Sequence, residues 1–270
     1  MTLLSNLHTH TTYCDGANTP REMVDAALAK GFHTLGFSGH AYTSFDTSYC
    51  MTPLGMRAYK EEVRSLGDEY EGRIRIYLGI ENDACDPQPR DGLDYIIGSS
   101  HYLSLHGIYH ALDNTPEMMH ACINSFGGAL GMVQAYYRQL SQYALQEHPD
   151  IIGHFDVITK FNANSRFFDT DSPSYRRLAL EAIEAVAQSG AIVEVNTGGM
   201  AKGFTTMPYP APFLLKRLLE LGVPIVVNSD AHAAGLLDAH FATVRTLLRD
   251  IGFRETMEYT PSGFVPAPLL

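Results

Sequence analysis

The chain has 270 residues, of which 45% are hydrophobic and 18% are charged. This length suits one large α/β domain or two small ones, and the apolar content excludes an intrinsically disordered chain. The 19 basic and 30 acidic residues give a formal net charge of -11. This acidic balance disfavours a nucleic-acid-binding surface, which would be basic.

The cysteines and the apolar runs indicate where the protein works. Four cysteines are irregularly spaced with no CxxC pair, which favours free thiols in a reducing compartment over a disulfide framework. The stretch MTLLSNLHTH lacks a basic segment followed by a long apolar one, so we expect no signal peptide. No apolar run approaches the roughly 20 residues that span a membrane. We therefore expect a soluble, cytoplasmic protein.

Short apolar runs alternate with amphipathic stretches along the chain. Each run is continuous rather than alternating in polarity, which is typical of a parallel strand buried on both faces. These runs predict strands at Leu3–His8, Thr34–Ser38, Ile74–Ile80, Tyr95–Ser99, Ile151–Phe155, Ala191–Asn196 and Pro224–Ser229.

The stretches between these strands carry helix signals. Thr19 is an N-cap, Pro20 occupies the first helical position, and Gly31 ends this helix. A later pattern is expected to break near Gly127 and Gly128. The further predicted helices are Leu54–Tyr70, Pro116–Gln146, Ser174–Ser189, Ala211–Leu221 and Ala239–Ile251.

Repeated alternation of strand and helix predicts an α/β fold with a parallel sheet. Because no stretch resembles a linker, a closed barrel in one domain, residues 1–270, fits best. An open doubly wound sheet is the alternative, but such sheets usually carry a glycine-rich phosphate loop, and none is visible. We expect Asp46–Met56 and His101–Gln134 to form rims or lids, and Glu255–Leu270 to form an extended closing segment.

Imidazole and carboxylate side chains stand where the predicted strands end. One such histidine would mean little, but a series predicts a polynuclear metal site at the C-terminal ends of the strands. This mixture of ligands suits zinc, iron or manganese. The candidate ligands are His8 and His10 in LHTH, Asp15 in CDG, His40 in GFSGH, Glu81 in LGIE, His101 in IGSSH, His154 in IIGHFD, and Asp230 and His232 in VVNSDAH.

Two pairs and one carboxylate carry most of this prediction. His8 and His10 are two apart at a strand end, so both imidazoles can face one ion. Asp230 and His232 follow the apolar run PIVVNS in the same way, and a charge there is costly unless it is paired or metal-bound. Glu81 follows IYLGI, and a carboxylate can bridge two cations. Singly, each could be an ordinary polar residue.

Three ions in one pocket would imply phosphate or phosphate-ester chemistry, because clustered cations neutralise ester oxygens and lower the pKa of a bridging water. The chain has no GxSxG nucleophile elbow, no P-loop and no dinucleotide fingerprint. The other histidines are predicted on the surface or in solvated loops, namely His33, His106, His110, His120, His148 and His240.

The motifs HTHTTYCDG, GFSGH, GIE, SSH, GHFD and NSDAH, in this order, resemble the PHP (polymerase and histidinol phosphatase) family over most of the chain. DGANTPREMVDAALAKGFHTLGFSGH, EVNTGGMAKG and YPAPFLL resemble its histidinol-phosphate phosphatase branch. The resemblance implies a distorted (β/α)7 TIM-like barrel with a trinuclear metal centre. It also implies hydrolysis of L-histidinol phosphate to L-histidinol and phosphate, in histidine biosynthesis, by a metal-bridging hydroxide.

The same resemblance implies how the ligands divide. One ion would be held by His8, His10, Glu81 and Asp230. The second would be held by Glu81, His101 and His154, and the third by Asp15, His40 and His232. Asp230 or His232 is placed to protonate the leaving alkoxide. Side chains in loops or at strand ends on this side of the barrel are candidates to bind substrate, namely Lys160, Arg166, Lys202 and Asn196.

Other functions stay open at this point. One is a PHP phosphoesterase for another small phosphate ester or a nucleotide. Another is a non-catalytic PHP module, which a complete ligand set argues against. A third is an amidohydrolase-type enzyme acting on C–N bonds, which shares the HxH pair but would need a metal-bridging lysine. We expect two or three divalent ions (Zn, Fe or Mn) and a small phosphorylated substrate, with no nucleic acid and no membrane as partner.

Overall fold

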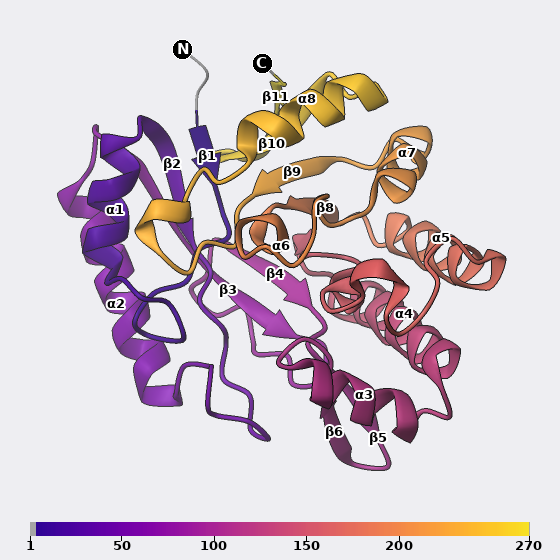
Figure 1. The fold of residues 1–270 in the computed structure, drawn as a ribbon. Coiled ribbons are helices and arrows are strands. Elements are labelled where there is room, and N and C mark those ends of the chain that lie inside the picture. Colours follow the sequence, from indigo (N-terminus) through magenta and orange to yellow (C-terminus); the bar gives the residue numbers. More distant parts are fainter. Residues whose placement is uncertain (1–3, 270) are drawn as a thin grey trace.

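Seven parallel strands form the centre of the protein. The computed structural model describes residues 4–269 and places the strands in the order β1-β2-β3-β4-β7-β8-β9. Figure 1 shows the strands at the centre with helices around them. Each predicted strand is present, although Leu3 of the first lies outside the described residues. Their bounds are β1 Leu4–Asn6, β2 Phe32–Phe37, β3 Arg75–Asp83, β4 Tyr95–Ser99, β7 Ile151–Ile152, β8 Ile192–Asn196 and β9 Ile225–Asn228.

The helices also follow their sequence signals. Thr19 and Glu22 form a reciprocal capping box at the start of the first helix. Gly127 and Gly128 have φ of 74° and 117°, which divides the long pattern into two helices, as predicted. The helices are α1 Pro20–Ala29, α2 Pro53–Glu69, α3 Pro116–Ser125, α4 Ala129–Glu147, α5 Pro173–Ala187, α6 Gly198–Ala201, α7 Pro212–Leu221 and α8 Phe241–Ile251. The short α6 was not predicted.

The barrel closes between β1 and β9, but not through a regular ladder of hydrogen bonds. The side-chain oxygen of Asn228 accepts from the backbone N–H of Leu7 at 2.8 Å, and Asn6 donates to the Ser229 hydroxyl at 2.6 Å. Beyond the strands, Thr9 and Ala231 form a parallel bridge. The barrel is therefore nearly closed and distorted. The open doubly wound alternative is wrong.

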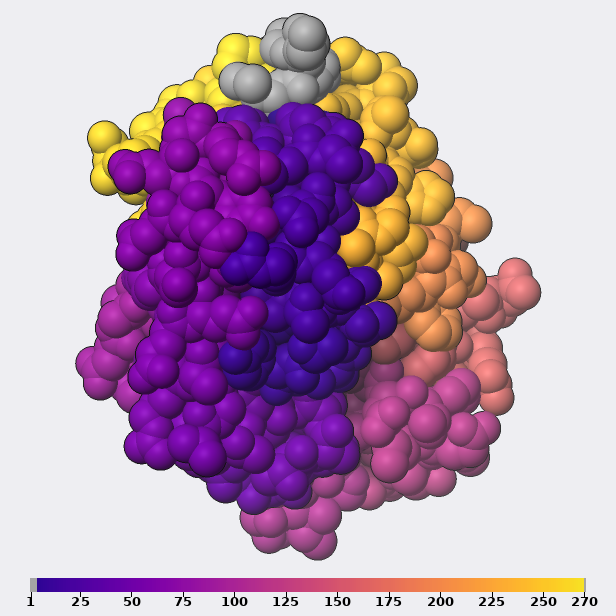
Figure 2. Space-filling view, turned by 90° about the vertical axis from the view of Figure 1, so that its left-hand side faces the viewer, coloured from indigo at the N-terminus to yellow at the C-terminus, as the bar shows by residue number. Residues whose placement is uncertain are grey.

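The two ends of the sequence consequently lie side by side. Figure 2 shows N-terminal residues in indigo against C-terminal residues in orange and yellow on one face of the molecule. Lys30, which follows α1, pairs with Asp238 at 2.6 Å, close to the start of α8. Along the described chain, no helix is long and apolar enough to cross a membrane.

The barrel interior is apolar at its N-terminal end. The buried side chains there include Tyr95, Ile97 and Val226. The predicted extended tail is instead an antiparallel hairpin of β10 (Glu255–Thr260) and β11 (Gly263–Pro268). Tyr259 of this hairpin packs against that cluster and donates to the Asp94 carbonyl at 2.9 Å. The hairpin thus covers the end of the barrel opposite to the predicted site.

A second hairpin stands at the C-terminal ends of the strands. It consists of β5 (Tyr102–Leu105) and β6 (Ile108–Ala111), inside the stretch predicted as a rim. The hydroxyl of Tyr102 donates to Asp46 at 2.6 Å, which joins this hairpin to the other predicted rim stretch. The two rims therefore contact each other over the side of the barrel where the strands end.

Candidate metal centre

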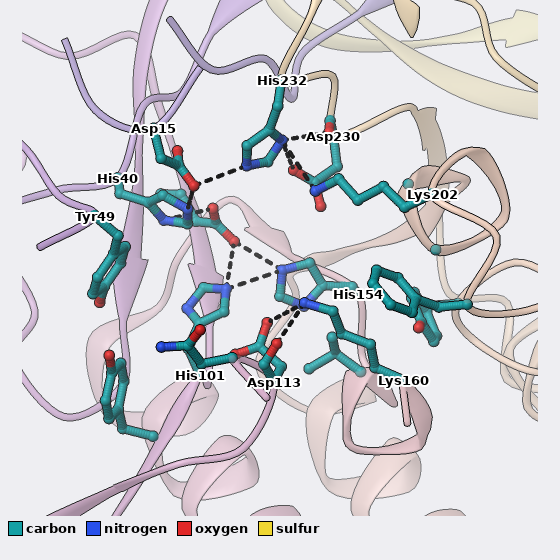
Figure 3. Close-up of a pocket in the computed structure, with 18 of the residues that line it drawn as sticks. Asp15, His40, Tyr49, His101, Asp113, His154, Lys160, Lys202, Asp230 and His232 are labelled. Carbon is teal, nitrogen blue, oxygen red and sulfur yellow. Dashed lines mark hydrogen bonds and ion pairs between the residues drawn. The ribbon is translucent and has the colours of Figure 1, made fainter. Parts of the chain in front are cut away.

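The structure brings all nine candidate ligands together at the C-terminal ends of the strands. Six of them are labelled in Figure 3, where they surround one pocket. They come from six different strands or the turns that follow them, so only the closed barrel makes them neighbours. His8, His10 and Asp15 follow β1, His40 follows β2, Glu81 is in β3, His101 follows β4, His154 follows β7, and Asp230 and His232 follow β9.

Glu81 lies at the centre of this cluster and is only 2% exposed. Its Oε2 atom is 3.1 Å from His8 Nε2 and 3.1 Å from His40 Nδ1. Its Oε1 atom is 2.9 Å from His154 Nε2 and 3.4 Å from His101 Nε2. The two oxygens of one carboxylate therefore face two separate groups of imidazoles. This is the geometry of a bridging ligand.

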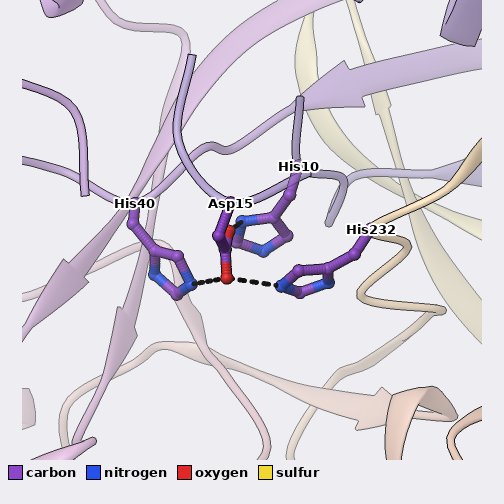
Figure 4. Close-up of side chains that lie close together, drawn as sticks. All are labelled: His10, Asp15, His40 and His232. Atoms are coloured by element: carbon purple, nitrogen blue, oxygen red, sulfur yellow. Dashed lines mark ion pairs between the residues drawn. The ribbon is translucent and has the colours of Figure 1, made fainter. Parts of the chain in front are cut away.

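The ligand atoms form overlapping groups. Figure 4 shows His40 and His232 on either side of Asp15, with His10 behind it. Nε2 of His232 is 3.2 Å from Asp15 Oδ2, and His10 Nε2 is 3.1 Å from Asp230 Oδ1. Groups compact enough to hold one ion are His8, His10 and Asp230; His40, Glu81 and His101; and His10, Asp15, His40 and His232. His10 and His40 each belong to two groups, whereas the resemblance assigned each to one.

Three of the atoms that could bind a metal ion are buried and lack a hydrogen-bond partner among the described residues. They are Nε2 of His8, Nε2 of His10 and Oε2 of Glu81. A buried polar atom without a partner costs about 1–3 kcal/mol. A divalent cation among these nitrogen and oxygen atoms would satisfy all three. The residues present therefore fit a bound metal ion.

The electrostatics of the cluster also favour a cation. Burial by itself would lower the pKa of His8, but the carboxylates of Glu194 and Glu81 outweigh it and raise the pKa to about 10. Burial by itself would raise the pKa of Asp230, yet His8 and Lys202 hold it well below its usual range. The pocket thus gathers carboxylates that stay ionised and attract positive charge.

The backbone at Asp230 is held in an uncommon conformation, with φ of 51°. A non-glycine residue in this region is strained and persists only where its surroundings enforce it. A Cβ atom on Gly198 would lie 3.0 Å from Cβ of Asp230, so this glycine leaves room for the carboxylate to reach the cluster. Such strain is often found at functional sites.

A cavity of about 410 Å³ opens beside the cluster. Lys202 lines it, with its Nζ atom 3.3 Å from Nδ1 of His232. Lys160 also lines it and donates to the carbonyl of Asp113, while its Nζ atom lies 3.3 Å from the carboxylate of the same residue. Two of the four predicted substrate-binding side chains therefore reach the cavity. Tyr49 and Tyr102, from the two rims, form another wall.

The other two predicted substrate-binding residues are not among those that line the cavity. Arg166 is exposed and lies over the ring of Phe167, 5.0 Å from its centroid, because its loop turns outward. Asn196 is buried, and its amide donates to Glu194 at 2.8 Å while its oxygen accepts from the N–H of Gly198. Arg166 therefore lies outside the site, and Asn196 lies beneath it, hydrogen-bonded to Glu194.

Sequence reasoning missed three acidic residues. Asp83 accepts from the backbone N–H of His101 at 2.8 Å, Asp113 lines the cavity, and Glu194 accepts from His8 Nδ1 at 2.7 Å. Two of them carried a signal in the sequence. Asp83 stands two residues after Glu81 on one strand, hence on the same face, and Glu194 interrupts the apolar run AIVEVN. Asp113 lies in an irregular loop that gave no signal.

The remaining histidines stay away from the cluster. His33 is partly buried rather than on the surface, because it pairs with Glu258 of the C-terminal hairpin at 3.1 Å. His106, His120, His148 and His240 are exposed, as predicted, and His110 is intermediate.

A model of the PHP domain matches residues 6–198. The chain belongs to the PHP domain family. A protein of Deinococcus radiodurans named "Probable histidinol-phosphatase" is 33% identical over 265 residues, which cover 94% of this chain and 96% of that protein. The histidinol-phosphatase of Bacillus subtilis is 27% identical, with 84% and 93% covered. The alignments with these relatives cover most of this chain and extend beyond residue 198, where the match to the PHP domain model ends.

The fold also matches solved PHP structures. The histidinol phosphate phosphatase of Lactococcus lactis, complexed with zinc, L-histidinol and phosphate, has a TM-score of 0.73 at 20% identity. The alignment covers 97% of this chain and 98% of that one. At this identity the match establishes the distorted barrel. The centre of the cluster is occupied by the carboxylate of Glu81 and not by the lysine expected of an amidohydrolase-type site.

Proposed function

We propose that this PHP protein is a metal-dependent phosphoric monoester hydrolase that converts L-histidinol phosphate to L-histidinol and phosphate, a step of histidine biosynthesis. The observation that carries the proposal is the convergence of nine imidazole and carboxylate side chains, with Glu81 at their centre, beside a cavity lined by Lys202. Relatives named histidinol-phosphatase over nearly the full length of the chain support the choice of substrate. We also propose that residues 1–270 work as one domain with a small phosphorylated substrate as partner.

We propose that the nine residues hold two or three divalent ions, with zinc, iron and manganese as candidates. The ligands would be His8, His10, Asp15, His40, Glu81, His101, His154, Asp230 and His232. When bound, such ions neutralise phosphate oxygens and lower the pKa of a water between them. Zinc in the complex of the Lactococcus lactis relative supports this choice of cofactor.

The phosphate is proposed to bind between the metal cluster and Lys202. The Nζ atom of Lys202 lies within 3.3 Å of His232, so an anion at the cluster could accept a charge-assisted hydrogen bond from it. Asp230 and His232 stand beside the same point, and one of them would supply the proton that the leaving alkoxide needs. Nδ1 of His232 lies 2.9 Å from the carbonyl oxygen of Asp230, which orients the imidazole.

The other wall of the cavity suits the alcohol part of the substrate. L-histidinol carries an amine and a flat imidazole ring. Asp113 is an ionised carboxylate on this wall, because Lys160 and His101 lower its pKa although burial by itself would raise it. Tyr49 and Tyr102 offer aromatic faces, with ring centroids 6.0 Å apart. A cationic, ring-bearing alcohol therefore complements this wall better than a neutral sugar would.

Phosphate release from L-histidinol phosphate by the metal-loaded protein tests the proposal. Asp230→Asn serves as the matched variant, and p-nitrophenyl phosphate and a sugar phosphate serve as comparison substrates. We expect turnover of L-histidinol phosphate at a kcat/KM well above that of the other esters, and its loss in the variant. Protein with bound metal that leaves L-histidinol phosphate intact but hydrolyses another ester would refute the substrate while keeping the phosphoesterase chemistry.

A further inference from the structure

Glu194 is a buried carboxylate beneath the metal centre. It lies in the middle of β8 and is 0% exposed, so its charge must be compensated within the protein. Its Oε1 atom accepts from Nδ1 of His8 at 2.7 Å and from the amide of Asn228 at 2.9 Å. Its Oε2 atom accepts from the backbone N–H of His154 at 2.9 Å and from the amide of Asn196 at 2.8 Å.

We propose that Glu194 is a positioning residue that aims His8 and His154 at two neighbouring metal ions at once. This inference rests on the proposed function, because it assumes that the cluster binds metal. The bond from Nδ1 of His8 fixes the imidazole tautomer that leaves Nε2 free to bind a cation. The bond to the backbone of His154 fixes the residue that faces the other oxygen of Glu81.

The hydrogen bonds around Glu194 require its ionised form. Four donors converge on the two carboxylate oxygens, so both oxygens act only as acceptors and the group carries no proton. A glutamine of the same shape offers one acceptor and one donor group. Its NH2 group would face two of the four donors and leave them unpaired.

The same network reaches the seam that closes the barrel. Asn228 donates to Glu194 and accepts from the backbone N–H of Leu7, which directly precedes His8. Asn196 likewise donates to Glu194 and accepts from Gly198, which packs against Asp230. The position of the first metal ligand and the closure of β1 against β9 are thus set by one set of hydrogen bonds.

Zinc affinity of the metal-free full-length protein tests this role, measured by competition with a chromophoric chelator. We expect Glu194→Gln to weaken zinc binding about 10- to 100-fold, as loss of a partner of a ligating histidine does in other metal sites. Asp94→Asn is the matched control. Asp94 accepts from the backbone N–H of Leu78 at 2.8 Å at the opposite end of the barrel. This control removes a supporting carboxylate and should keep wild-type zinc affinity.

The outcomes separate the inference from the proposed function. The positioning role is supported if Glu194→Gln binds zinc more weakly than wild type while Asp94→Asn keeps wild-type affinity. Equal zinc affinity in wild type and Glu194→Gln overturns the positioning role but not the proposed function. The same holds if Asp94→Asn loses as much zinc affinity as Glu194→Gln, because that result indicates general destabilisation. No zinc binding by wild type overturns the proposed function.

A conservative variant covers the case in which Glu194→Gln does not fold. Glu194→Asp keeps the charge but is one methylene shorter, so it cannot reach all four donors. We expect this variant to bind zinc more weakly than wild type. Wild-type zinc affinity in folded Glu194→Asp would overturn the inference.

Discussion

Replacement of Lys202 by methionine removes a cationic group that lies beside the proposed phosphate position and keeps most of the side chain's length. Lys202 follows α6, and its Nζ atom lies 3.3 Å from His232 at the edge of the cavity. The lysine makes no ion pair with a carboxylate among those found in residues 4–269. Its ammonium group lines the cavity, where it can act on a bound anion.

The size of the effect follows from the exposure of this lysine. A hydrogen bond to a charged group contributes about 1.5–3 kcal/mol. Lys202 is exposed, so screening by solvent places its contribution at the lower end of that range, about 1.5–2 kcal/mol. Because about 1.4 kcal/mol corresponds to a factor of ten in rate, kcat/KM for L-histidinol phosphate should fall about tenfold to thirtyfold.

Steady-state kinetics on zinc-loaded protein measure this, with inhibition by free phosphate as a second readout. We expect Lys202→Met to raise both KM and the inhibition constant of phosphate. Arg166→Met is the control, since Arg166 is also a cation in a loop on this side but does not line the cavity. A wild-type kcat/KM in Lys202→Met, or an equally large loss in Arg166→Met, would contradict the proposed role of Lys202.

Four further predictions concern the metal and the barrel. A chelator should abolish phosphate release and lower the melting temperature, and added zinc should restore both. Tyr95→Phe leaves the carbonyls of Leu7 and Phe37 without their buried hydroxyl donor and should lower the free energy of unfolding by about 1–3 kcal/mol in urea denaturation. Gly98→Ala places a Cβ inside the contact distance of the Tyr143 ring and should destabilise the fold by about 1–3 kcal/mol or more, seen as a lower melting temperature. Thr19→Ala removes a helix cap and should lower the free energy of unfolding by about 1 kcal/mol in urea denaturation; a wild-type free energy of unfolding would contradict a stabilising role for this cap.

The strands of the barrel, most of the helices and the set of candidate ligands could be predicted from the amino-acid sequence. Continuous apolar runs gave the seven parallel strands because such strands are buried on both faces, and local caps such as Thr19 gave the helix starts. The nine candidate ligands could be picked out because parallel strands expose their C-terminal ends at one edge. A polar side chain directly after a buried run must point there or be compensated.

How these side chains share the site depends on the tertiary structure. His10 and His40 each belong to two groups of ligand atoms, and no pattern in the sequence reports this sharing. Arg166 and Lys202 lie in loops on the same side of the barrel and Asn196 ends β8, yet Arg166 turns outward and Asn196 is buried beneath the cluster. The direction of such a side chain depends on contacts with residues far away in the chain, and the hydrogen bonds from His8, His154 and Asn228 to Glu194 are a further example.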